Sequence, residues 1–298
     1  MPKPTRIIDS HQHVFWHGRD DHGLVADLDE HGIEKAWLLS WEMAPWEDEA
    51  FYHRVLNPLN MRSDGTHAGI PLRDLVTARD RYPDRFLLGY CPHPELGDAP
   101  KLLEAAVQMY GAQICGEWKF RLLFDDPRCL EIFYTAGQLG LPVVLHLGVP
   151  YLQIEGKRTY VPSWYGGTVD NLERALEACP QTVFIGHAPG FWREISGDAQ
   201  SDPAEYPQGP IVEGSRMKRL FDGYPNLYAD LSAGSCRYAL ERDPAHARQF
   251  LERYQDRLLF ARDQYGGHLH GFIEGLDLSL DAIEKIYWKN SERLLNRA

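Results

Sequence analysis

Side chains that can bind a metal ion recur at the ends of apolar runs in this 298-residue sequence. His11 and His13 close the first run, RIIDSHQH, and residues two apart in a strand point to the same face. His146, His187 and Asp263 fall late in three later runs. Burying several imidazoles and a carboxylate side by side is costly without a cation, so the set predicts a metal site.

The His-x-His spacing is weak evidence when taken alone. The chain contains 13 histidines, and His268 and His270 form a second pair of the same spacing in a Gly-flanked segment. For any one histidine, a buried ring that is only hydrogen-bonded is the alternative. The prediction of a metal therefore rests on position at the strand ends. Imidazole and carboxylate ligands favour Zn²⁺, with Mn²⁺, Fe²⁺ or Co²⁺ as alternatives.

The fourth run, ICGEWKF at 114–120, carries Glu117 and Lys119 on one face. Glu117 is a candidate metal ligand, and an ion pair between Glu117 and Lys119 inside the fold is the alternative. Lys119 and Arg121 also share a face and could clamp a substrate carboxylate, whereas a solvated Arg121 is equally consistent with the sequence. Trp16 and Tyr265, which follow the first and eighth runs, are further candidate substrate contacts.

Eight short apolar or β-branched runs have to position these side chains. They lie at 6–13, 35–41, 86–93, 114–120 and 142–148, and start again at 182, 227 and 258. Between them are segments with helical patterning, such as APKLLEAAVQMYG, CLEIFYTAGQLG and TVDNLERALEACP, each ending near Gly or Pro. Eight strand–helix units predict an α/β fold closed into a (β/α)8 TIM barrel, which assembles active sites at the carboxyl ends of its strands.

An open doubly wound sheet is the competing architecture, but the Gly-rich turn expected after its first strand is missing here. Two spacers, roughly 42–85 and 191–226, exceed the usual length of a loop between strand and helix. We therefore expect one barrel domain over 1–298, distorted by long loops after strands 2 and 6 that contain lids or extra helices. Their aromatic residues, Trp41, Trp46, Tyr52, Trp192 and Tyr206, could line a pocket or pack beneath the loops.

The overall charge points to a small-molecule partner. The chain has 31 basic and 43 acidic side chains and a formal charge of -12, which disfavours binding to nucleic acids or anionic membranes. It has no apolar signal segment and no apolar run of about 18 residues, and its five cysteines are scattered. These features predict a cytoplasmic protein with reduced thiols, and exposed aromatics in the long loops leave room for a homodimer.

The chain resembles the amidohydrolase superfamily, and within it the amidohydrolase-2 branch of decarboxylases, lactonases and hydratases. The resemblance covers nearly the whole chain and is carried by IDSHQH, FDDPRCLEIFYTAGQLGLPVVLHLG, FIGHAPG, NLYADLSAGS, DRLLFARDQYG and IYWKNSERLL. It implies that His11, His13, His146 and Asp263 bind a catalytic metal, and that His187 is a base beside the metal or a further ligand. It also implies that Asp263 takes a proton from metal-activated water.

The sequence departs from this family's commoner pattern at the eighth strand. Many relatives have Gly-Ser-Asp where this chain has Ala261, Arg262 and Asp263, so Arg262 could alter how the loop packs or bind an anionic group. In parts of the superfamily a Glu or a carboxylated Lys at the fourth strand bridges two metals. Glu117 therefore leaves either one or two ions open.

Three functions remain in view. The first is a metal-dependent hydrolase that uses metal-activated water on an amide, lactone or ester carbonyl, with His187 or Asp263 moving protons. The second is a lyase of the same barrel that decarboxylates or hydrates an unsaturated or aromatic acid, which Lys119, Arg121 and Arg262 would favour. The third is a non-catalytic barrel that binds a metabolite through structural histidines.

Overall fold

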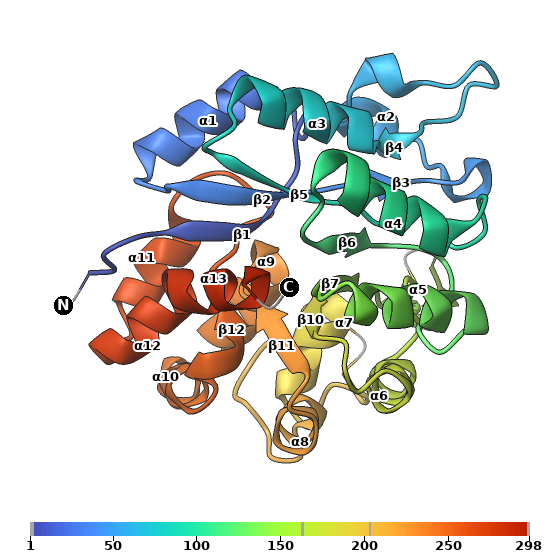
Figure 1. Cartoon of the computed structure of the whole chain (residues 1–298). Coiled ribbons are helices and arrows are strands. Elements are labelled where there is room, and N and C mark those ends of the chain that lie inside the picture. Colours follow the sequence, from blue (N-terminus) through green and yellow to red (C-terminus); the bar gives the residue numbers. More distant parts are fainter. Residues whose placement is uncertain (1–2, 162–163, 203, 297–298) are drawn as a thin grey trace.

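A parallel β-barrel forms the centre of the computed structural model, which describes residues 3–161, 164–202 and 204–296 (Figure 1). Within these ranges eight barrel strands occur where the sequence predicts them. They are β1 (Ile8–Gln12), β2 (Lys35–Leu39), β5 (Phe86–Gly89), β6 (Cys115–Trp118), β7 (Val143–His146), β10 (Phe184–His187), β11 (Leu227–Asp230) and β12 (Leu258–Leu259).

The strands pair in parallel and in sequence order around the barrel. One sheet has the order β1-β2-β5, and a second has the order β6-β7-β10-β11-β12. A parallel bridge between Gly89 and Ile114 joins β5 to the start of β6. On the other side, the Ser10 amide of β1 donates to the Phe260 carbonyl just after β12 at 2.9 Å. The barrel is therefore closed, and the predicted (β/α)8 fold is confirmed.

Helices cover the outside of the barrel (Figure 1). They are α1 (Asp21–Glu30), α3 (Leu72–Arg81), α4 (Ala99–Tyr110), α5 (Pro127–Gln138), α6 (Val169–Ala178), α8 (Arg216–Gly223), α9 (Ala233–Glu241), α10 (Pro244–Arg253), α11 (His268–Glu274), α12 (Leu280–Glu284) and α13 (Asn290–Leu295). Local sequence sets their ends. Thr168 caps α6 through a reciprocal bond with Asn171, and α4 stops at Gly111, which adopts a left-handed φ of 70°. The three predicted helical segments are confirmed.

Two apolar layers hold the fold together. Inside the barrel, alternate strand residues such as Trp37, Val144 and Ile185 form one buried cluster, which Leu294 of α13 joins. The opposite strand faces and the helices form a second, larger cluster outside the barrel. Strands that are apolar on both faces match this double burial, as expected for parallel strands. In the part of the chain that the structure describes, no helix is both long and apolar enough to cross a membrane.

Long loops distort the barrel after its second and sixth strands, as predicted. The first contains α2 (Tyr52–Val55) and an antiparallel pair, β3 (Trp41–Glu42) with β4 (Gly69–Ile70). The second contains α7 (Pro189–Trp192) and a short 3-10 helix, Arg193–Ile195. A third insertion was not predicted. It is the antiparallel hairpin of β8 (Tyr151–Ile154) and β9 (Lys157–Tyr160), which follows β7.

Candidate metal and active site

Five side chains that can bind a metal converge at the carboxyl ends of the barrel strands. His11 and His13 come from β1 and the residue after it, Glu117 from β6, His187 from β10 and Asp263 from the loop after β12. The histidines and Glu117 are almost fully buried. Because parallel strands end at one rim of a barrel, residues far apart in sequence meet here.

Short distances join these groups around one centre. His13 Nε2 lies 3.3 Å from Glu117 Oε2 and 3.5 Å from Asp263 Oδ1. His187 Nε2 lies 3.6 Å from Glu117 Oε1 and 3.8 Å from Asp263 Oδ2. His11 Nε2 lies 3.9 Å from Asp263 Oδ1 and 4.0 Å from Glu117 Oε1. Two sets of three have ligand atoms within 4.8 Å of one another: His11, His13 and Asp263, and His11, Glu117 and His187.

Two polar atoms at this centre have no hydrogen-bond partner. They are Nε2 of His11 and Oδ1 of Asp263, and both are buried. An unsatisfied buried acceptor costs about 1–3 kcal/mol, and more when it is charged. A divalent cation would accept both lone pairs at once. The donor set therefore fits a metal ion that takes nitrogen and oxygen ligands.

Hydrogen bonds behind the histidines turn their Nε2 atoms toward the centre. His11 Nδ1 lies 2.8 Å from Oδ2 of Asp230, and His187 Nδ1 lies 3.1 Å from Oδ1 of the same residue. His13 Nδ1 lies 2.8 Å from the Leu39 carbonyl. A carboxylate or carbonyl acceptor requires the proton on Nδ1, which leaves the Nε2 lone pair free for a metal.

The role of Asp230 was missed in the sequence. This carboxylate is buried at the end of β11, and the Ser232 hydroxyl also donates to it at 2.6 Å. The signal was its position, because Asp230 ends the seventh predicted strand in the same way that His146 and His187 end theirs. In the sequence, Asp230 is a single acidic residue before LSAGS, and it was not recognised as a site residue as the histidines were.

The electrostatics of the centre favour a cation. Burial alone would lower the pKa of His11, but Asp230 and Asp263 raise it to about 10. Burial alone would raise the pKa of Glu117, but His146 and His13 hold it well below its ordinary value. The centre therefore stabilises positive charge and keeps Glu117 ionised.

His146 is not in either set of three. Its Nδ1 lies 2.6 Å from Glu117 Oε1, and its ring centroid lies 5.5 Å from that of Tyr165. Burial, together with the charge of Lys119, lowers the pKa of His146 to about 3. His146 is thus neutral and bonded to Glu117, rather than brought together with His11 and Asp263.

Asp263 is held in an unusual backbone conformation. Its φ is +53°, in the left-handed region that Asp tolerates better than most residues. The Asp263 amide donates to the His11 carbonyl at 2.9 Å, and the Trp16 indole donates to the Asp263 carbonyl at 3.2 Å. Tyr265 in turn donates to the Trp16 carbonyl at 2.8 Å. Trp16 and Tyr265, predicted as substrate contacts, thus support the loop that carries Asp263.

Lys119 and Arg121, predicted together as a carboxylate clamp, have different surroundings. The ammonium of Lys119 lies 4.0 Å from the ring centroid of Trp41, and 5.7 and 5.5 Å from those of Tyr52 and Tyr165. Among the described residues, no carboxylate lies within 4.0 Å of it. Arg121 is ion-paired with Glu49. Lys119 thus has no carboxylate partner in the described ranges, and its charge acts on Glu117 and His146.

Arg262 serves to pack the eighth loop. Its Nε lies 2.6 Å from Asp9 Oδ2, and its Nη1 lies 2.7 Å from Asp27 Oδ2. All three residues are buried. Of the two roles considered for Arg262 in the sequence, the structure therefore supports packing, with the guanidinium already neutralised by two carboxylates.

The other histidines and aromatics have structural surroundings. His93 bonds to Glu47 at 3.0 Å. His268 and His270 lie in α11, where His270 Nε2 is 3.3 Å from Glu274. Trp192 is buried and donates to the Asp230 carbonyl, and Trp46 is exposed. Of the long-loop aromatics, Trp41 and Tyr52 have their rings beside the ammonium of a candidate site residue, Lys119.

Solved structures share this fold. A 5-carboxyvanillate decarboxylase from Sphingomonas paucimobilis is 16% identical, with a TM-score of 0.61 and coverage of 97% of this chain and 98% of that one. A dihydroxybenzoic acid decarboxylase from Polaromonas sp. JS666, solved with manganese and 2-nitroresorcinol, is 17% identical, with a TM-score of 0.55 and coverage of 97% and 96%. A protein from Pseudomonas putida provisionally described as a 2-pyrone-4,6-dicarboxylic acid hydrolase is 14% identical, with a TM-score of 0.60 and coverage of 98% of both chains.

Sequence comparison gives the family. No curated protein sequence matches the chain. The family model Amidohydro_2, described as amidohydrolase, matches residues 8–297. The chain therefore belongs to this amidohydrolase family.

Proposed function

We propose that this protein is a metal-dependent decarboxylase of a small aromatic or unsaturated carboxylic acid. The observation that carries the proposal is Lys119, whose ammonium lies on the face of Trp41 beside Glu117 and has no carboxylate partner among the described residues. A fixed, unpaired cation next to a metal site is suited to hold a substrate carboxylate. This reverses the order favoured by the sequence, in which hydrolysis came first.

The metal in this proposal is held by His11, His13 and Asp263, with Glu117 and His187 facing the same centre. One ion is favoured over two. Both sets of three share His11, whose Nδ1 is taken by Asp230, so a single Nε2 lone pair remains. His146, implied as a ligand by the family resemblance, would instead orient Glu117.

The bound ion would supply Lewis-acid polarisation of a substrate oxygen. Zn²⁺ and Mn²⁺ both suit nitrogen and carboxylate ligands. The Polaromonas decarboxylase contains manganese, which raises Mn²⁺ from an alternative to a candidate of equal weight with Zn²⁺. The structure of the site is compatible with either ion.

The protein's own side chains have separable tasks in decarboxylation. Lys119 would orient the acid so that the carbon–carbon bond to the carboxylate can break, releasing CO₂ and leaving the electron pair on the substrate carbon. That carbon then needs a proton. His187 Nε2 faces the centre beside Asp263, and Asp230 fixes its ring, so a proton taken up from solvent at His187 Nε2 would pass to that carbon.

A panel of hydroxylated aromatic and unsaturated acids tests the proposal. Metal-loaded enzyme should release CO₂ from at least one acid, and the His11→Ala/His13→Ala variant should not. Hydrolysis is followed in parallel, as proton release from lactones and esters. Hydrolysis without CO₂ release would overturn the decarboxylase proposal.

Hydrolysis is the second candidate, and one feature favours it. His187 Nε2 faces the centre while Nδ1 is bonded to a buried carboxylate, the arrangement of a general base that can take a proton from water. The Pseudomonas structure is provisionally described as a hydrolase. The same panel separates the two, because a hydrolase would acidify lactone or ester solutions and release no CO₂.

A further inference from the structure

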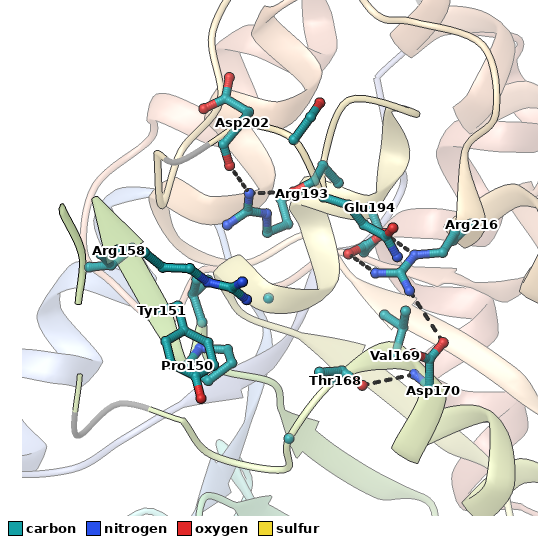
Figure 2. A pocket seen from close by; sticks show the side chains of 18 residues that line it. Pro150, Tyr151, Arg158, Thr168, Val169, Asp170, Arg193, Glu194, Asp202 and Arg216 are labelled. Carbon is teal, nitrogen blue, oxygen red and sulfur yellow. Dashed lines mark hydrogen bonds and ion pairs between the residues drawn. The ribbon is translucent and has the colours of Figure 1, made fainter. Parts of the chain in front are cut away.

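A cavity of about 520 Å³ lies between the segments that follow β7 and β10 (Figure 2). Its walls are formed by the β8–β9 hairpin, the start of α6, the segment 190–202 and the start of α8. None of the side chains proposed for the metal lines it. Its volume lies in the range of about 300–1,000 Å³ that holds small molecules in proteins.

Arg193, in the short helix after α7, places a buried cation in the wall of this cavity. Only 9% of Arg193 is exposed. Its Nη2 donates to the carbonyls of Ala199 and Asp202, but its Nε is buried and has no partner. Among the described residues, no carboxylate lies within 4.0 Å of the guanidinium. The carboxylates of Glu194, Asp202 and Asp198 raise the pKa of Arg193 from longer range, but burial lowers it by more, so an anion in direct contact would stabilise the guanidinium.

Arg158 of β9 adds a second guanidinium from the opposite wall. It lies over the ring of Tyr151, 4.5 Å from the centroid. Figure 2 shows its side chain reaching from the hairpin toward the part of the cavity where Arg193 lies. In the described part of the chain, Arg158 also has no carboxylate within 4.0 Å.

The other charged residues of the lining are one cation, Arg216, and three carboxylates, Asp170, Glu194 and Asp202, so the lining as a whole carries three charges of each sign. Arg216 binds Glu194 through two hydrogen bonds, of 2.7 and 2.6 Å, and also lies 3.2 Å from Asp170. The carboxylate of Asp202 is the other negative group, and it accepts from the Ala204 amide at 2.8 Å. In the lining, Asp202 is thus the one carboxylate without an ion-pair partner, beside the two guanidiniums of Arg158 and Arg193.

We propose that this cavity is a second ligand site, which binds a small organic anion through Arg158 and Arg193. The ligand would carry a carboxylate or a phosphate group, because both accept charge-assisted hydrogen bonds from guanidinium groups. The site does not depend on the metal or on the reaction proposed above. Its lining includes Gly148 and Gly190, so the ligand would contact the segments that follow His146 and His187.

Isothermal titration of the metal-loaded full chain tests the site, with inorganic phosphate and benzoate as separate probes. Phosphate and benzoate distinguish the two anion classes. Arg158→Gln should weaken binding of the preferred probe at least about tenfold, the loss expected for one charge-assisted hydrogen bond. Lys157→Gln is the matched control, because it removes the same charge from the same hairpin at an exposed position outside the lining, and it should change affinity less than about twofold.

Two further variants locate the bound probe. Asp202→Asn removes the one unpaired negative charge of the wall and should tighten binding of the same probe severalfold. Lys119→Met alters the proposed active site and should leave the cavity's affinity unchanged. The proposal is overturned if wild type binds neither probe, if Arg158→Gln binds as tightly as wild type, or if binding is lost in Lys119→Met while Arg158→Gln retains it.

Discussion

The Nδ1 atom of His11 lies 2.8 Å from Oδ2 of Asp230, a buried carboxylate at the end of β11 and 219 residues later in the sequence. The other oxygen of Asp230 lies 3.1 Å from His187 Nδ1. One carboxylate therefore fixes the orientation of two imidazoles whose Nε2 atoms face the same centre. Such partners behind a metal-binding histidine set both its tautomer and its basicity.

Asp230→Asn should weaken metal binding about 10–100-fold, because an amide cannot hold two imidazoles in the required tautomer. Competition with a chelating indicator measures the loss. Asp222→Asn is the matched control, since Asp222 pairs with Arg253 on the surface, and it should bind metal as wild type does. Equal affinity in Asp230→Asn and wild type would show that Asp230 does not orient the ligands.

Lys119→Met should lower kcat/KM for a carboxylic acid substrate about 10–100-fold, the loss expected for one charge-assisted hydrogen bond. Lys119→Arg keeps the charge over Trp41 and should retain more activity than Lys119→Met. Metal content, measured in the same preparations, should stay at the wild-type level. A Lys119→Met enzyme as active as wild type would remove the main support for an acid substrate.

Arg262→Gln should lower the free energy of unfolding by about 3–5 kcal/mol, because it leaves the buried carboxylates of Asp9 and Asp27 without their partner. Urea unfolding measures the change. Arg253→Gln, which breaks an exposed ion pair with Asp222, should cost no more than about 1 kcal/mol. Similar losses in the two variants would contradict the packing role of Arg262.

Asp27 should make part of the stability depend on pH. Burial opposes its ionisation, but Arg262 and the Gly266 amide hold its pKa below the ordinary value of 3.8. The unfolded chain then binds a proton more readily than the folded one, so this stabilisation is present at neutral pH and is lost as the pH falls below about 5. Urea unfolding of wild type and Asp27→Asn should therefore differ most near neutral pH. A difference that stayed constant into acid would exclude this ionisation as the cause.

Gly190→Ala should lower the thermal midpoint, because it crowds the backbone that follows His146. A Cβ at Gly190 would lie 2.0 Å from the Gly148 carbonyl and 2.6 Å from that of Leu147, which directly follows His146. Overpacking of this kind costs about 1–3 kcal/mol or more, since backbone cannot move aside as a side chain can. Gly271→Ala, in α11 with nothing within 4 Å, is the control and should not lower the thermal midpoint. Equal midpoints in the two variants would contradict the close approach.

The barrel could be predicted because each strand is a short apolar run buried on both faces. The β8–β9 hairpin could not be predicted, although a tight two-residue turn joins its strands. That turn is formed by Glu155 and Gly156, with φ of 50° and 75°, and Glu-Gly is a weaker hairpin signal than Asn-Gly or Asp-Gly. A hairpin inside a barrel loop also lacks the apolar run of a core strand.

The site residues that lie at or just after strand ends could be predicted from the sequence. His11, His13, Glu117, His187 and Asp263 were all candidates and lie together, whereas His146 lies against Glu117 instead. Lys119 and Arg121 looked equivalent in sequence because Arg121's partner, Glu49, is 72 residues away in a long loop. Such long-range pairs depend on loop conformation, which local sequence does not determine.

The central claim is that the strand-end side chains bind a metal ion, and elemental analysis of purified protein tests it most directly. Wild type should contain about one equivalent of a transition metal per chain, and His11→Ala/His13→Ala should contain almost none. His22→Ala/His53→Ala alters two histidines outside the proposed ligand set, bonded to Tyr82 and Asp48, and should match wild type. Wild-type protein that takes up no transition metal, or a His11→Ala/His13→Ala variant that keeps a full equivalent, would contradict the account.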